Sequence, residues 1–134
     1  MKTSAGAKER APQTTPVDDA PPLAPHMALD VVHLARMTLG ERTVEREVLE
    51  LFDRQAAMLL QRMVAEPPKV VAAFAHTLCG SARGIGAWKV AEAAEAVERC
   101  ASQNAAVGLS GAVERLRTAV EEARAAIVEH LRTH

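Results

Sequence analysis

The chain has 134 residues, enough for one domain with a single hydrophobic core. Hydrophobic residues make up 49% of it, but aromatic residues only 2% and tyrosine is absent, which favours packed helices over sheets. The formal net charge of -1 excludes a general electrostatic attraction to nucleic acid or to an anionic membrane surface. We therefore expect no nucleic-acid partner and no membrane partner.

Residues 1–28 form a segment rich in Pro, Ala and Thr. Five of the seven prolines lie in it: Pro12, Pro16, Pro21, Pro22 and Pro25. No apolar periodicity accompanies them, so we predict a disordered tail. Residues 29–134 are predicted to form one helical domain.

The cysteine content and the apolar runs predict a cytoplasmic protein. Cys79 and Cys100 both fall inside predicted helices, and free thiols in a helical protein suit a reducing compartment. No apolar run approaches the ~20 residues that span a bilayer. Lys2 and Lys8 are followed by no apolar stretch of the kind that a secretory signal requires.

Two helices are expected first in this domain. The first is short, runs over about 29–39 and ends at Gly40. The second runs over about 41–65, and the prolines at 67 and 68 stop it. Its apolar spacing predicts one buried face. That face is made of Val44, Val48, Leu51, Phe52, Leu59 and Met63.

Three further helices follow. One covers about 69–83, with Pro68 in its first turn and glycines at its end. The next covers about 87–103, begins with Trp88 and carries the charged series Glu92, Glu95, Glu98 and Arg99, which we interpret as a solvated face. Its buried side is predicted as Val90, Ala94, Val97 and Cys100 or Ala101. Ser110 is the expected N-cap of the last helix. The predicted stripe of that helix is Val113, Leu116, Val120, Ala123, Ile127 and Leu131.

These elements predict an all-α fold. Four amphipathic helices with short connections imply an antiparallel four-helix bundle, and the short additional N-terminal helix lies across one end of it.

His76 stands on the side of its predicted helix that faces away from the core. At about 100° per residue, the apolar positions Val71, Phe74, Leu78 and Ile85 cluster on one side, and His76 points in almost the opposite direction. Lys69, Ala72, Cys79, Gly80 and Arg83 are its expected neighbours on the outer face. A glycine inside a helix costs roughly 0.5–1 kcal/mol relative to alanine. Gly80, one turn after an exposed histidine, therefore suggests that another molecule comes close there.

The segment His76-Thr77-Leu78-Cys79-Gly80-Ser81-Ala82-Arg83-Gly84-Ile85-Gly86-Ala87 resembles the motif of histidine-containing phosphotransfer (HPt) domains, usually written HxLKGSxxxxGA. The specific part of the resemblance covers about a dozen residues. It implies that His76 accepts a phosphoryl group from a receiver-domain aspartate and passes it to another receiver domain in a two-component phosphorelay. The implied partners are response-regulator receiver domains and a hybrid histidine kinase.

The same resemblance implies a phosphotransfer protein with a phosphohistidine intermediate and no ATP-dependent kinase activity of its own. No resident cofactor is expected, because the Mg²⁺ belongs to the partner receiver domain. We expect a monomer. Ala72, Ala73, Gly80 and Arg83 are the expected docking residues, and Cys79, Gly80, Arg83 and Lys69 the expected neighbours of the phosphoryl group.

One position departs from the motif. Members of the family usually carry a lysine three residues after the histidine, whereas this chain has Cys79. Arg83 and Lys69 are each seven residues from His76, roughly 10 Å along a helix, and Lys89 is a third cation to consider. We expect either slower phosphotransfer than with the lysine or a phosphohistidine of shorter lifetime.

Other functions remain open at this stage. A degenerate domain would bind a receiver or kinase as a non-catalytic adaptor. His76 and Cys79 have a spacing that can share one metal ion, although structural zinc needs four ligands. An exposed Cys79 would also suit a redox sensor. The glycines from Gly80 to Gly86 resemble the dinucleotide loop of short-chain dehydrogenases, but the chain is too short for that sheet and lacks the catalytic tyrosine.

Overall fold

The computed structural model describes residues 27–103 and 106–134. These residues form five helices: α1 (Val31–Met37), α2 (Arg42–Met63), α3 (Pro68–Ile85), α4 (Trp88–Ser102) and α5 (Ala106–Thr133). The prediction of an all-helical chain is confirmed for the described ranges. The predicted disordered tail falls almost wholly outside them, so it stays a prediction.

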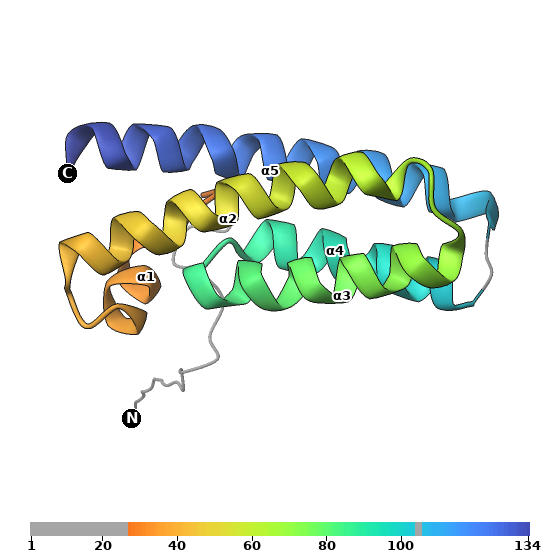
Figure 1. Cartoon of the computed structure of the whole chain (residues 1–134), viewed down its shortest axis with the longest axis horizontal. Helices are drawn as coiled ribbons and strands as arrows, with labels where there is room; N and C mark the ends of the chain where they lie inside the picture. The colour runs from red at the N-terminus through yellow and green to blue at the C-terminus, as the bar shows by residue number, and fades with distance from the viewer. Residues whose placement is uncertain (1–26, 104–105) are drawn as a thin grey trace, which may run out of the picture.

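The four long helices lie side by side along one common direction, and the chain reverses direction from each to the next (Figure 1). α3 packs against α2 and α4, and α5 packs against α4 and α2. The short α1 lies at the end of the bundle where α3 ends, and it contacts α3. The core between them is aliphatic. Its largest fully buried side chains are Leu34, Leu49, Leu78, Leu116, Ile127, Val90, Val97 and Val120.

Both ends of α3, which carries His76, follow from its sequence. Pro68 occupies the first turn, where a missing N–H costs nothing. Gly86 ends the helix in a left-handed conformation, with φ of 85°. A Cβ on Gly86 would stand 2.8 Å from the carbonyl oxygen of Asp30, so this position needs glycine for conformation and for space. The helix extends two residues beyond the predicted end at 83.

Asp30 fastens α1 to the turn between α3 and α4. Its Oδ1 accepts a hydrogen bond from the backbone N–H of His33 at 3.0 Å, which caps α1. Its Oδ2 accepts one from Nε1 of Trp88 at 2.9 Å, and its backbone N–H donates to the carbonyl of Gly86 at 2.9 Å. His33 adds a hydrogen bond from Nε2 to the carbonyl of Arg83. Trp88 is the first residue of α4, as predicted, and its ring stands edge-on to that of His33.

The predicted buried face of α2 was partly wrong. Val44 and Leu51 are 41% and 57% exposed, whereas Leu49, Ala56 and Leu60 are buried. α2 carries apolar residues over more than half of its circumference, and spacing alone does not say which part of so wide an arc faces the core.

The predicted start of the last helix was also wrong. α5 begins at Ala106, so Ser110 lies inside it and is not its N-cap. Gly108 and Ser110 are poor helix formers, but Leu109 between them packs against the core, and tertiary packing outweighs their weak local preference. The predicted stripe from Leu116 to Ile127 is buried.

Candidate functional site

His76 lies in the middle of α3 and points into solvent. Its side chain is 76% exposed. The core side of the same helix is Val71, Ala75, Leu78, Ala82 and Ile85, all buried. The imidazole therefore has no packing role in the bundle.

Glu98 of α4 holds the imidazole by one ring nitrogen. Its two carboxylate oxygens lie 3.1 and 3.3 Å from Nδ1 of His76. A carboxylate accepts and does not donate, so Nδ1 carries the proton that the carboxylate binds, and in the neutral ring the lone pair is on Nε2. The carboxylate thus selects the tautomer and orients the ring so that a nucleophilic nitrogen faces outward.

The sequence analysis missed this partner, because it placed Glu98 on a solvated face. The usable signal was the distance of each residue from the turn between α3 and α4. His76 lies ten residues before Gly86, and Glu98 lies eleven residues after Ala87. Residues at matching distances from a tight turn stand opposite one another in an antiparallel helix pair.

Several of the cations on α3 and α4 have carboxylate partners. Nη2 of Arg83 is 2.9 Å from Glu95, and Arg99 approaches the same carboxylate at 3.9 Å, so both guanidinium groups are directed to Glu95. Lys69 is exposed at the start of α3. Lys89 is directed to Glu122 of α5 at 3.4 Å, on the side of α4 away from α3.

Cys79 does not lie on the outer face, which corrects the expectation for this residue. It is only 6% exposed and belongs to the core cluster. The cause is its position about 100° beyond the buried Leu78, on the side of α3 that α4 covers. Burial raises the pKa of the Cys79 thiol; Arg83 lowers it, while Glu95 and Glu98 raise it further. A neutral, covered thiol removes the basis for a redox sensor and for a shared metal site with His76.

The small residues around His76 leave the surface open. Ala73 and Gly80 are exposed, and a Cβ built on Gly80 meets no atom within 4 Å. Ala72, in contrast, is half-buried and packs against the core. Gly80 is therefore not required by any contact inside the bundle.

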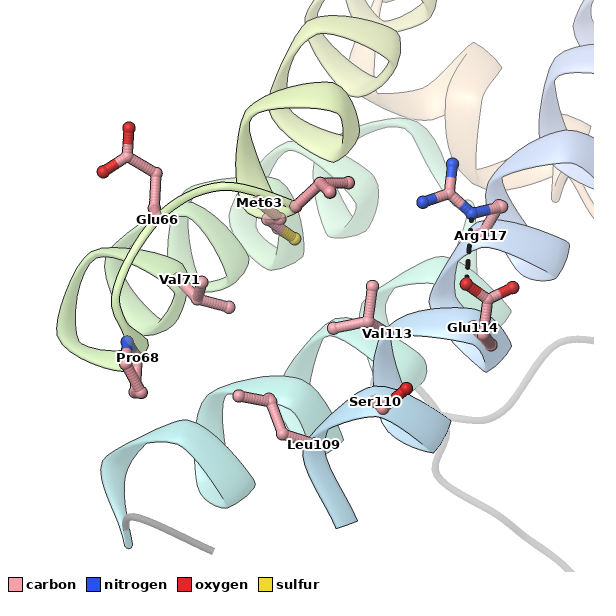
Figure 2. Close-up of a pocket in the computed structure, with 10 residues that line it drawn as sticks. Met63, Glu66, Pro68, Val71, Leu109, Ser110, Val113, Glu114 and Arg117 are labelled. Atoms are coloured by element: carbon pink, nitrogen blue, oxygen red, sulfur yellow. Dashed lines mark ion pairs between the residues drawn. The ribbon is translucent and has the colours of Figure 1, made fainter. Parts of the chain in front are cut away.

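The pocket in Figure 2 lies away from this histidine. It has a volume of about 360 Å³ and opens where α2 meets α3 and where α5 begins. Met63, Val71 and Val113 form apolar walls, and the Glu114–Arg117 ion pair stands at the rim. None of the predicted site residues lines it. His76 thus stands on an open helix surface and outside this pocket.

The described residues contain no group of three or more His, Cys, Asp or Glu side chains that could hold a metal ion. Within the same ranges, no helix is long and apolar enough to cross a membrane.

Comparison with known proteins identifies one family. The family model described as "Hpt domain" matches residues 47–126, which is more than half of the chain. The match contains all of α3 and α4 and so includes both His76 and Glu98. No curated protein and no solved structure matches the chain significantly.

Proposed function

The chain belongs to the Hpt domain family and so to the proteins of His-phosphotransfer signalling, and from this premise we propose that His76 is its phosphoacceptor. In this proposal the chain is an antiparallel four-helix bundle, extended by α1, that relays a phosphoryl group in the cytoplasm. The group arrives from the aspartate of one receiver domain and leaves to the aspartate of another. A hybrid histidine kinase supplies the first receiver.

The observation that carries this proposal is the hydrogen bond between Nδ1 of His76 and Glu98 on an otherwise open imidazole. The Nε2 lone pair attacks phosphorus of the phospho-aspartate. The N–P bond forms as the P–O bond to the aspartate breaks, and the aspartate leaves as a carboxylate. The Nδ1 proton stays on the ring, where the Glu98 carboxylate balances the positive charge that develops there.

The remaining requirements of phosphoryl transfer are met by the partner. Transfer depends on in-line positioning and on cations around the equatorial oxygens. The receiver brings the magnesium and the acyl phosphate. The Hpt chain contributes a fixed imidazole and, at Ala73 and Gly80, a surface with nothing to obstruct the approach.

The test is to incubate the full chain with candidate phosphorylated receiver domains and to compare the wild type with His76→Gln. We expect a label that is acid-labile and base-stable on the wild type and absent from the variant. His134→Gln, at an exposed position after the end of α5, is the matched control and should label normally.

A binding function without transfer would give a different result. A degenerate adaptor would bind a receiver with the same affinity before and after His76→Gln and would never acquire the label. That outcome would replace the phosphotransfer proposal.

A further inference from the structure

An exposed apolar stripe runs along α2, beside the face that packs into the bundle. Val44, Leu51 and Met58 recur every seven residues and are 41%, 57% and 50% exposed. Val48 and Gln55 lie between them and are half-buried. The spacing therefore alternates between four and three residues over the whole stripe.

This alternation is the pattern by which one helix packs along another. Residues repeating every 3.5 positions form a seam, and a scattered set of exposed apolar residues would show no such repeat. α2 has 22 residues and is about 33 Å long at ~1.5 Å per residue. The stripe occupies most of that length, so its natural complement is a second helix lying along α2.

The charges at the edge of the stripe identify which helix fits. Glu47 and Arg54 directly precede Val48 and Gln55, and because they are seven residues apart they lie on the same edge. Both are exposed, and within the part of the chain that the structure describes neither forms an ion pair. Their signs are opposite, and their midpoint lies next to Leu51.

We propose that α2 is a self-association surface and that its occupant is α2 of a second copy of this chain, packed antiparallel about a two-fold axis near Leu51. In that arrangement Val44 of each copy lies opposite Met58 of the other. Glu47 of each copy lies beside Arg54 of the other, which forms the same ion pair twice. A parallel pairing brings like charges to the same level.

The size of the surface sets the strength of the dimer. A stable protein interface buries about 800 Å² on each partner. One stripe on one helix is smaller than that, so the proposed dimer is a weak one. The monomer expected from the sequence then prevails at low concentration. The proposal concerns α2 alone and does not depend on phosphotransfer at His76.

Sedimentation equilibrium of the full chain over a wide concentration range tests the proposal. The wild type should move from monomer to dimer as concentration rises. Glu47→Arg and Arg54→Glu should each raise the dissociation constant about tenfold, because two attractions become two repulsions. The combination of both substitutions should restore wild-type association, because the pairs reform with their signs exchanged.

Two further variants distinguish association through this stripe from non-specific hydrophobic association. Leu51→Glu should abolish the dimer, whereas Val64→Glu, at a 72% exposed position outside the stripe, should leave it unchanged. Circular dichroism of each variant checks that the helices persist. A chain that stays monomeric at all concentrations, or a double charge exchange that fails to restore association, overturns the proposal. Substitutions in the stripe that change receiver binding and leave self-association unaltered also overturn the proposal.

Discussion

At the residue scale, Glu98 and His76 act as one unit, since the carboxylate decides which ring nitrogen is free. The bond lies at the surface, so its value is in orientation and tautomer more than in stability. Glu98 is a positioning residue by this argument, because it acts through the imidazole.

Replacing Glu98 by alanine should slow phosphoryl acceptance about tenfold, because the free imidazole distributes its proton between both nitrogens and rotates. Glu98→Gln should retain part of the rate, since its amide oxygen still accepts from Nδ1. Nitrogen NMR of the imidazole should show the tautomer ratio shifting in the alanine variant. Glu92→Ala, at a position that lines the surface between α4 and α5, should leave rate and tautomer unaltered. An unchanged tautomer ratio in Glu98→Ala would refute the positioning role.

Gly80 offers a test in which stability and transfer should move in opposite directions. Gly80→Ala should raise the free energy of unfolding by about 0.5–1 kcal/mol, because alanine favours the helix and a Cβ has open space there. Gly80→Trp should keep the helix content and yet reduce labelling by a phosphorylated receiver severely. Urea unfolding and labelling rates provide the two measurements. Normal labelling of the tryptophan variant would show that no partner approaches this position closely.

Cys79 shows why the helical wheel was accurate for His76 and inaccurate three residues later. A position opposite the core is exposed whatever the neighbouring helices do. A position at the edge of the core is covered or open according to where the next helix packs, and α4 covers this one. The wheel contains no information on α4, so the side chain that stands in place of the usual lysine could not be placed from α3 alone.

At the element scale, α1 depends on the charge of Asp30. Burial alone would raise the pKa of this carboxyl, but the hydrogen bonds from Trp88 and His33 more than offset that effect and lower it below the ordinary 3.8. A carboxyl whose pKa is lower in the folded state contributes stability that is present above its unfolded pKa. That contribution is lost as pH falls through the lower folded value.

The wild type should therefore be more stable than Asp30→Asn by about 1 kcal/mol at pH 7, since hydrogen bonds to a charged acceptor are stronger than those to an amide. Asparagine still caps α1. The difference should shrink as pH is lowered below about 4. Urea unfolding at several pH values, followed by the fluorescence of the single tryptophan, Trp88, measures it. A difference that is independent of pH would contradict this account.

Helix number and approximate position could be predicted because prolines, glycines and apolar spacing act locally. The boundaries from α1 to α4 were close for that reason. The start of α5 and the buried face of α2 were not predictable in this way. The start of α5 depends on the packing of Leu109 against the core. The buried face of α2 depends on which neighbouring helices cover its wide apolar arc.

At the scale of the whole molecule, polar side-chain contacts join α2 and α5 at two levels. Arg124 meets Asp53 at 2.6 Å, and His130 meets Glu45 at 2.7 Å. The second pair is largely covered, with side chains only 10% and 13% exposed. It closes the end of the bundle opposite the α2–α3 turn.

His130→Ala should lower the free energy of unfolding by about 1–3 kcal/mol, because it leaves the Glu45 carboxylate covered and without this partner. Arg132→Ala provides the comparison on the same helix. It breaks an exposed pair with Glu129 and should cost less than about 0.5 kcal/mol. Urea unfolding of both variants is sufficient. Equal losses would mean that coverage of the His130 pair has no energetic effect.

Contacts between distant parts of the chain were the least predictable feature. The pairs His76–Glu98, Asp30–Trp88 and Glu45–His130 each join different helices. Periodicity describes one helix at a time and so identifies His76 as exposed without identifying what holds it. The motif around His76 indicates phosphotransfer, whereas the Glu98 carboxylate beside it is apparent only in the packed bundle.

The anchoring of α3 at both ends has a consequence for any molecule that docks there. Pro67 and Pro68 fix its beginning, and Gly86, Asp30 and His33 fix its end. The backbone around His76 is therefore helical before an encounter takes place. Association then requires no free energy to order that segment, and its main entropic cost is the lost tumbling of two rigid bodies. If the proposed receivers dock there, each of them meets His76 in the same place, which suits brief and repeated encounters.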